Sequence, residues 1–191
     1  MNDLAPTPAT TALLLMDLQP GILSRLPDSD AYLAGLVRAR EAARAAGVTV
    51  GYVRVAITAE EAATIPSRSR FARAGERLDP NSPETQIDPR IAPAEGEIVV
   101  RKKRVGAFST TDLDEQLQAR GIDTLVLAGV ATSGVVLSTV RDASDRDYRV
   151  VVLEDGCWDS DPEVHQVLTA KVFARGGVTV TSIEDFIASV A

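Results

Sequence analysis

Short apolar runs alternate along this chain with longer segments in which apolar residues recur at helical spacing. The short runs predict strands at 12–16, 48–55, 97–100, 124–128, 149–153 and 178–180. The runs at 124–128 and 149–153 are almost continuously apolar, which is typical of strands covered on both faces of a parallel sheet. The alternation predicts an α/β fold: a single domain of three αβα layers around a doubly wound, mostly parallel six-stranded sheet.

Local signals predict where several of the helices begin and end. Gly47 predicts a helix C-terminus, and Asp161, which precedes a proline, predicts a helix N-terminus. Thr111 with Asp114 predicts a capping box, and Ser182 predicts the cap of a last short helix. These signals support the alternation that the apolar runs indicate.

The segment 58–94 departs from this alternation. It is rich in Pro, Arg, Ser and Glu, and a connection this long within one domain is usually a lid, a binding loop or an interface arm. Its basic run 67–73 contains Arg68 and Arg70, which either hold a substrate carboxylate or, as charge runs more often do, face solvent or a subunit contact. We therefore expect one domain, 1–191, with 58–94 as a variable lid or interface segment.

Composition narrows the functional classes. The 191 residues are 45% hydrophobic with a net charge of −7, which disfavours nucleic acid and anionic membranes as partners. No apolar run is long enough for a bilayer and no signal peptide is apparent, so we expect a cytoplasmic protein. One cysteine and one histidine leave no zinc set, and no glycine-rich phosphate loop is present. We expect neither metal nor cofactor.

Three polar or turn-forming features follow predicted strands. Asp17 ends the first strand, Lys102 ends the third, and the small-residue stretch 129–139 follows the fourth and leads into a helix. In open α/β sheets, ligands bind beyond the carboxyl ends of the strands, so the three features are expected at one edge. Taken singly, Asp17 is also a common turn residue and Lys102 a common solvated lysine.

The residues around these features resemble a known family. The stretch 13–19 is an apolar run followed by Asp-x-Gln, the stretch 102–108 is a lysine followed by a small-Ala-Phe sequence, and 129–139 is a tight turn before a helix. Together they are similar to the isochorismatase-like family, also called the cysteine hydrolases. The similarity covers nearly the whole chain apart from the middle segment.

The resemblance implies a catalytic site that lacks its usual nucleophile. In the family, the seventh residue of the turn is usually a catalytic cysteine, whereas here it is Val135. The family's aspartate takes the thiol proton, its lysine stabilises negative charge, and backbone N–H groups of the turn form an oxyanion hole next to a cis peptide. Carried over, Asp17 and Lys102 are the catalytic residues, and the cis bond lies between Val130 and Ala131.

The same resemblance and the nearby strand ends extend the expected site. The expected substrate pocket and oxyanion turn comprise Gln19, Phe108, Val130, Ala131, Thr132, Ser133, Gly134 and Val135. The expected clamp for a substrate carboxylate comprises Arg54, Arg68 and Arg70.

Three functions remain open from the sequence. The first is an isochorismatase-like hydrolase of a small organic substrate that works without a thiol, with Asp17 as general acid or base. An acid role requires a raised pKa, which desolvation favours and Lys102 opposes. The second is a lyase- or isomerase-type enzyme of secondary metabolism, and the third is an inactive pseudoenzyme or binding protein. The resemblance also implies a homodimer or homotetramer.

Overall fold

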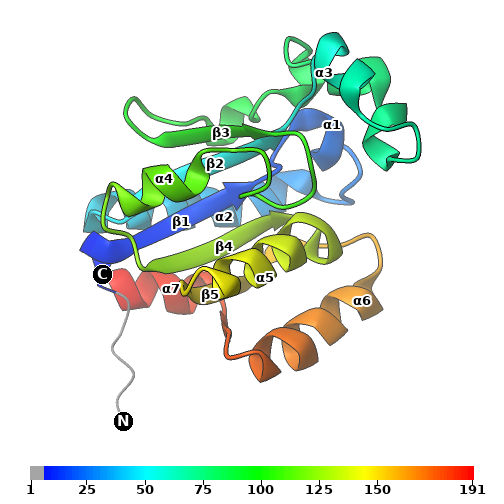
Figure 1. Ribbon diagram of the computed structural model, residues 1–191. Coiled ribbons are helices and arrows are strands. Elements are labelled where there is room, and N and C mark those ends of the chain that lie inside the picture. The colour runs from blue at the N-terminus through cyan, green and yellow to red at the C-terminus, as the bar shows by residue number, and fades with distance from the viewer. Residues whose placement is uncertain (1–6) are drawn as a thin grey trace.

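A computed structural model of the protein describes residues 7–191, apart from the side chains of Arg73, Gly75 and Glu76. The six strands form one sheet in the order β3-β2-β1-β4-β5-β6, and every neighbouring pair is parallel (Figure 1). The strands are β1 (Thr11–Met16), β2 (Thr49–Val55), β3 (Ile98–Lys102), β4 (Thr124–Val130), β5 (Arg149–Trp158) and β6 (Thr179–Thr181). This is the doubly wound order, with the chain reversing its direction of winding between β1 and β4. The α/β prediction is confirmed.

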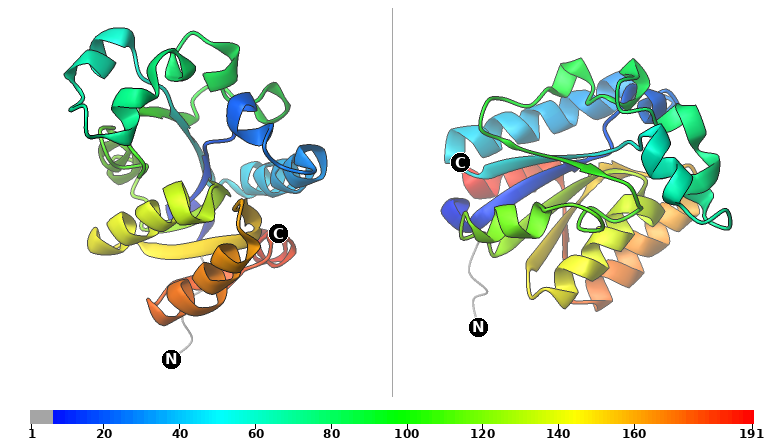
Figure 2. Two further views of the ribbon diagram at one scale, coloured as in Figure 1. Left: turned by 90° about the vertical axis from the view of Figure 1, so that its right-hand side faces the viewer. Right: turned by 45° about the horizontal axis from the view of Figure 1, so that its top comes forward.

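Helices cover both faces of the sheet (Figure 2). Side chains of α2 (Ser29–Ala46) and α7 (Ile183–Val190) pack with Leu13 and Leu15 on one face. Side chains of α4 (Leu113–Gln118), α5 (Leu137–Asp145) and the π-helical turns Leu168–Phe173 after α6 (Pro162–Val167) pack with Ala12, Leu14 and Met16 on the other. Successive β1 residues thus alternate between two apolar cores, as the two-residue period of a strand requires.

Several helix signals act as the sequence predicts. Gly47 ends α2 with φ of 77°, a left-handed conformation that glycine adopts without a steric penalty. Asp161 accepts hydrogen bonds from the N–H groups of Glu163 and Val164 at the start of α6, and Ser182 accepts one from Asp185 at the start of α7. These caps depend on neighbouring residues only, which explains why the local sequence predicts them.

Two local predictions are wrong. The capping box does not form, because Thr111 donates its hydroxyl to Ala107 and the Asp114 carboxylate instead accepts from Tyr148 and Arg146. The fifth strand continues past its polar interruption as far as Trp158, through a register shift opposite Leu127 and Gly129. The end of this strand therefore lies five residues beyond the predicted 149–153.

Apart from the 3₁₀ turn Pro8–Thr10 before β1, most of the remaining short elements lie at the carboxyl edge of the sheet. They are α1 (Pro20–Leu23), α3 (Ala59–Thr64) and the short 3₁₀ turns Arg70–Arg73, Gly75–Leu78, Pro83–Thr85 and Pro89–Ile91. Figure 1 shows α3 and the turns that directly follow it beyond the arrowheads of β2 and β3, whereas the turn Pro89–Ile91 packs against α2. The segment 58–94 therefore lies where a sheet of this type binds its ligands.

Within residues 7–191, no helix is both long and apolar enough to cross a bilayer.

Candidate active site

Asp17 and Lys102 meet at the carboxyl edge of the sheet. Asp17 follows β1 with φ of 59°, and its N–H donates to the carbonyl of Val53 at 2.8 Å. Lys102 ends β3, and its Nζ lies 2.8 Å from Asp17 Oδ2 and donates to the Val105 carbonyl at 2.6 Å. Since β2 separates the two strands, the side chains reach each other across the end of β2. The sheet thus brings the two expected catalytic residues together.

The two carboxylate oxygens of Asp17 differ in their hydrogen bonding. Lys102 holds Oδ2, whereas Oδ1 is buried and has no hydrogen-bond partner among the described residues. Burial raises the pKa of Asp17 from 3.8 to about 6, because loss of hydration outweighs the opposing charge and hydrogen bond of Lys102. The carboxyl group can therefore exchange a proton near neutral pH.

The turn after β4 is held tightly against the end of β1. The peptide between Val130 and Ala131 is cis, as the resemblance implies. Gly129 has φ of 150°, and a Cβ there would lie 2.2 Å from the carbonyl oxygen of Met16, so only glycine fits this approach. The π-helical turn Thr132–Val136 then leads directly into α5.

Two hydrogen-bonding contacts hold this turn against the segment that follows β5 and against α6. The N–H of Ser133 donates to Asp159 Oδ2 at 2.7 Å, and the Thr132 hydroxyl lies 2.8 Å from His165 Nδ1. The Ser133 side chain is exposed and lies outside the cavity lining, and Thr132 is buried under the turn. The expected oxyanion turn therefore divides into residues that line the cavity and residues that anchor it.

A cavity of about 290 Å³ opens beside Asp17 and Lys102. Its turn residues are Val130, Ala131, Gly134 and Val135. Val135 is 2% exposed, and with Val130 and Trp158 it makes an apolar wall of this cavity. Arg25, Arg70 and Arg104 supply positive charge to the same cavity.

Besides Thr132 and Ser133, four more expected site residues do not line this cavity. Arg54 donates to the carbonyls of Thr85 and Pro80 and so braces the segment 80–85, and Arg68 is exposed outside the cavity lining. Phe108 lies in the core with its ring centroid 5.9 Å from that of Tyr148. The side-chain amide of Gln19 is hydrogen-bonded to the backbone: Nε2 donates to the Val55 and Thr85 carbonyls, and Oε1 accepts from the Val55 N–H. Only Arg70 of the expected clamp reaches the cavity.

Several cavity residues were not expected from the sequence. They are Ile22, Arg25, Val55, Phe71, Arg104, Val105, Trp158 and Ser160. Trp158 and Ser160 would have been found from the true end of β5, and Arg104 belongs to the basic run that follows β3. Arg25 follows the short helix α1, and no pattern in the sequence marks it.

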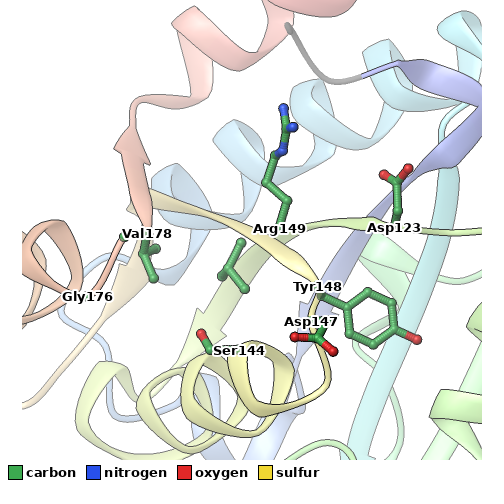
Figure 3. A pocket seen from close by; sticks show the side chains of 9 residues that line it. Asp123, Ser144, Asp147, Tyr148, Arg149, Gly176 and Val178 are labelled. Atoms are coloured by element: carbon green, nitrogen blue, oxygen red, sulfur yellow. The ribbon is translucent and has the colours of Figure 1, made fainter. Parts of the chain in front are cut away.

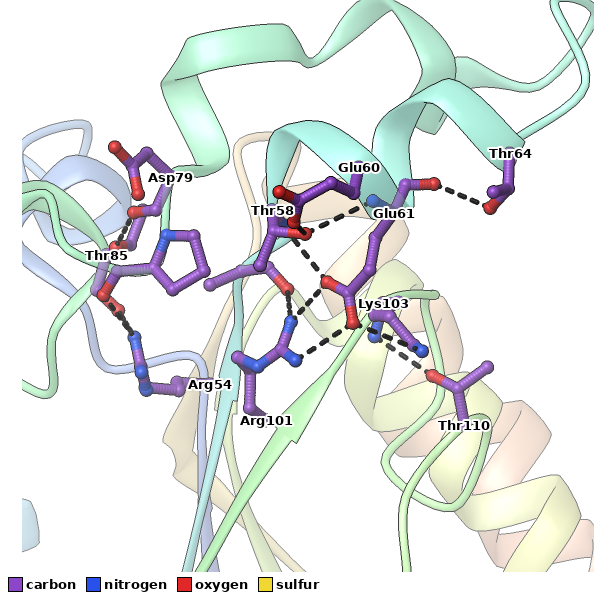
Figure 4. A network of polar contacts seen from close by, with 12 residues as sticks. Arg54, Thr58, Glu60, Glu61, Thr64, Asp79, Thr85, Arg101, Lys103 and Thr110 are labelled. Carbon is purple, nitrogen blue, oxygen red and sulfur yellow. Dashed lines mark hydrogen bonds and ion pairs between the residues drawn. The ribbon is translucent and has the colours of Figure 1, made fainter.

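A polar network secures the strand end that carries Lys102 (Figure 4). Glu61 on α3 accepts from Arg101 at 2.6 and 2.9 Å and lies 3.4 Å from Lys103 Nζ. The same carboxylate accepts from the N–H of Thr58 in a capping box. Glu61 therefore ties the start of the segment 58–94 to both neighbours of Lys102.

A separate cavity lies at the opposite, amino-terminal edge of the strands (Figure 3). It has a volume of about 480 Å³, and Asp123, Asp147 and Tyr148 are among its lining residues. None of the expected site residues lines it. Over the described part of the chain, no cluster of three or more His, Cys, Asp or Glu side chains is arranged to hold a metal ion.

Comparison with known proteins agrees with this architecture. The sequence model of the isochorismatase domain matches residues 11–185. The chain is 35% identical to N-carbamoylsarcosine amidase of an Arthrobacter species over 161 residues, which is 78% of this chain but 57% of the amidase. It is 31% identical to the ureidoacrylate amidohydrolase RutB of Methylobacterium radiotolerans, over 88% of this chain and 75% of that enzyme.

A solved structure extends the agreement to three dimensions. An isochorismatase family protein from Burkholderia thailandensis superposes with a TM-score of 0.83 at 29% identity, covering 95% of this chain and 96% of that one. The domain match, the sequence identities and the shared fold agree with one another. On these grounds the chain belongs to the isochorismatase family.

Proposed function

We propose that this protein is a hydrolase of a small organic substrate that works without a thiol, with Asp17 as general acid or base and Lys102 as charge stabiliser. The observation that carries the proposal is that the two carboxylate oxygens of Asp17 have different surroundings. Lys102 fixes one carboxylate oxygen, and the other is buried without a partner beside a cavity whose wall contains Val135. A positioned carboxyl group with a pKa near 6 suits proton transfer at neutral pH.

Amide hydrolysis can proceed on these groups without a covalent intermediate. The Asp17 carboxylate accepts a proton from water, and the water oxygen bonds to the amide carbonyl carbon. The Lys102 ammonium stabilises the negative charge that develops there. The carbon–nitrogen bond then breaks as Asp17 passes its proton to the leaving nitrogen, giving a carboxylic acid and an amine. The names of the two amide-hydrolysing relatives support amides as the first substrates to test.

The protonated form of Asp17 supports a second hydrolytic reaction. It can donate its proton to the carbon of a vinyl ether, after which water adds and the ether bond breaks. At pH 7 a group with a pKa near 6 is protonated in roughly one tenth of the molecules, and these molecules hold the acid form that the reaction needs. Amides and vinyl-ether carboxylates therefore belong in one substrate panel.

The positive charge of the cavity supports a carboxylate on the substrate. Arg70, from the expected clamp, lines the cavity together with Arg25 and Arg104. Asp17 is the only carboxylate among the described lining residues, and it is already paired with Lys102. Guanidinium groups bind carboxylates with two parallel hydrogen bonds, which also orients the substrate.

The direct test measures release of ammonia or pyruvate from that panel by wild type and Asp17→Asn. The matched control is Asp147→Asn, because Asp147 also has a positive φ, of 65°, but lines the cavity at the opposite edge. We expect turnover by wild type and the control, and a loss of at least about a hundredfold in Asp17→Asn. Equal turnover by both variants would exclude Asp17 as the acid or base.

Val135 favours one alternative, a binding protein or pseudoenzyme that keeps the cavity but not the reaction. Calorimetry distinguishes the two, since a binding protein would bind panel compounds tightly and release no product. A lyase or isomerase would consume panel compounds without adding water, which mass spectrometry detects.

We also propose that the protein is a cytoplasmic homodimer or homotetramer in which 58–94 is the lid or interface arm. Light scattering measures the mass of the oligomer.

A further inference from the structure

The cavity beside Asp17 adjoins a second chamber. This outer chamber has a volume of about 540 Å³ and lies under the segment 58–94. It shares five lining residues with the inner cavity: Ile22, Arg25, Val55, Arg70 and Phe71. Arg77, Leu78 and Ser82 line the outer chamber alone, whereas Arg104 lines the inner cavity alone. A ligand whose reactive end lies at Asp17 can therefore extend into the outer chamber.

The outer chamber carries an excess of positive charge. Arg25, Arg70 and Arg77 line it, against Glu84 as its one acidic lining residue among those described. No described carboxylate forms an ion pair with any of these three arginines. The excess is notable because the whole chain has a net charge of −7, so the chamber attracts anions that the rest of the surface repels.

Two other polar side chains of the chamber wall, Gln19 and Thr85, already use their donors within the fold. Gln19 uses its amide within the fold, and the Thr85 hydroxyl donates to the Asp79 carbonyl at 2.6 Å. The guanidinium groups are therefore the main donors left for a ligand. Their planar forks suit carboxylate and phosphate groups.

An apolar stretch connects the two anion-binding regions. Phe71 lines both chambers, and the guanidinium carbons of Arg70 and Arg104 lie 5.5 and 5.8 Å from its ring centroid. Ile22 and Val55 line both chambers as well. A ligand that spans the chambers thus passes Phe71 on its way between Arg104, which lines only the inner cavity, and Arg77, which lines only the outer chamber.

We propose that the outer chamber binds a second anionic group, so that the substrate is an elongated small-molecule dianion. One anionic group is held at Arg104 near the reacting bond, an apolar spacer crosses Phe71, and the second group, a carboxylate or a phosphate, is held at Arg77. This assignment rests on the proposed function, because it names the substrate class of the same site.

Calorimetric titration with defined probes tests the assignment. Suberate carries a carboxylate at each end, octanoate carries one on a chain of the same length, and an ω-phosphonoalkanoate of that length replaces one carboxylate by phosphonate. We expect wild type to bind a dianion about tenfold more tightly than octanoate, which corresponds to about 1.4 kcal/mol. Whichever dianion binds more tightly identifies the second group.

Three variants locate the two ends of the ligand. Arg77→Gln removes a cation of the outer chamber alone, Arg104→Gln removes one of the inner cavity alone, and Arg120→Gln removes an arginine on the surface near α4. We expect Arg77→Gln and Arg104→Gln each to lose most of the advantage of the dianion, and Arg120→Gln to keep it. Circular dichroism and melting temperature confirm that each variant is folded.

Two outcomes would overturn the assignment. One is equal affinity of wild type for octanoate and both dianions, and the other is an undiminished preference for the dianion in Arg77→Gln. Binding is measured without turnover, and the titrations can be repeated with Asp17→Asn. A failure of the proposed hydrolysis therefore leaves this test intact, and a failure here leaves the hydrolysis assay intact.

Discussion

At the scale of single residues, the site depends on how Asp17 is held rather than on its being acidic. Its backbone is fixed in a left-handed conformation by a hydrogen bond to Val53, and Lys102 occupies one of its oxygens. Burial then raises its pKa to about 6 in spite of the adjacent ammonium. Desolvation raises the pKa of Asp17 more than Lys102 lowers it, and a carboxyl group with this pKa can act as a base or an acid.

The pH dependence of kcat/KM follows from this value. If the Asp17 carboxylate is the base in amide hydrolysis, kcat/KM rises as the pH passes through about 6 and levels above it, because only the ionised form accepts a proton. Stopped assays across this range measure the profile. A profile that falls over the same range would instead assign Asp17 as the acid, and a flat profile would contradict both roles.

Introducing a thiol at position 135 tests whether the surrounding residues can support thiol chemistry. We expect Val135→Cys to gain release of ammonia from amides and to react with iodoacetamide, because the new thiol would lie beside Asp17 and Lys102 in the cavity. Background labelling should be low, since burial raises the pKa of the native Cys157 to about 12. Val135→Ala is the control for enlarging the cavity without a nucleophile. A reactive cysteine without any gain in amidase activity would show that the turn no longer supports thiol chemistry.

At the scale of elements, the end of β3 is joined by ion pairs to the segment 58–94 that lies over it. Arg101 and Lys103, on either side of Lys102, both contact Glu61 on α3, and Arg101 also donates to the Ala56 carbonyl at 2.9 Å. The start of the segment 58–94 is therefore attached to β3 on either side of Lys102 (Figure 4). The attachment also directs two neighbouring cations away from Asp17.

Loss of this attachment should loosen the segment more than it destabilises the fold. We expect Glu61→Gln to speed hydrogen exchange of the amides of α3 and to lower the free energy of unfolding by about 1 kcal/mol, because the ion pair is partly exposed. Glu60→Gln, on the same helix, is the matched control, since Glu60 is exposed and contacts only the Thr58 hydroxyl among the described residues. Equal exchange in the two variants would contradict the role of Glu61.

At the scale of the whole molecule, Asp17 has an effect on the pH dependence of stability that is the reverse of the usual effect of an aspartate. A carboxylate whose folded pKa is lowered by ion pairing stabilises the native state above its unfolded pKa. Asp17 has the reverse shift, from 3.8 to about 6, so the folded protein holds its proton more tightly than the unfolded chain does. The stability contributed by protonated Asp17 is present at low pH and is lost as the pH rises through about 6.

This contribution can be isolated by difference. As the pH rises from about 4 to about 6, we expect wild type to lose on the order of 3 kcal/mol of unfolding free energy relative to Asp17→Asn, whose side chain does not titrate. Urea unfolding at a series of pH values gives the difference, and other titrating groups cancel between the two proteins. The same comparison with Asp147→Asn shows the behaviour of an exposed aspartate. A difference that grows in favour of wild type as the pH rises would contradict the raised pKa.

The sequence by itself determined the arrangement of elements. The strands, the α2 C-terminus at Gly47 and the N-caps at Asp161 and Ser182 all depend on periodicity or on bonds between close neighbours. The meeting of Asp17 and Lys102 could also be anticipated, because the carboxyl ends of parallel strands share one edge of the sheet. The absence of a thiol at Val135 is likewise a fact of the sequence.

The tertiary structure decided which side chains reach the cavity and in what state. It diverted Arg54 and Phe108 into other contacts and brought Arg25 and Arg104 to the cavity. It also set the direction of the Asp17 pKa, because that direction depends on how completely water is removed around the carboxylate. Side-chain contacts between distant segments and the loss of hydration arise only when the chain is folded, and for this reason no local pattern could predict them.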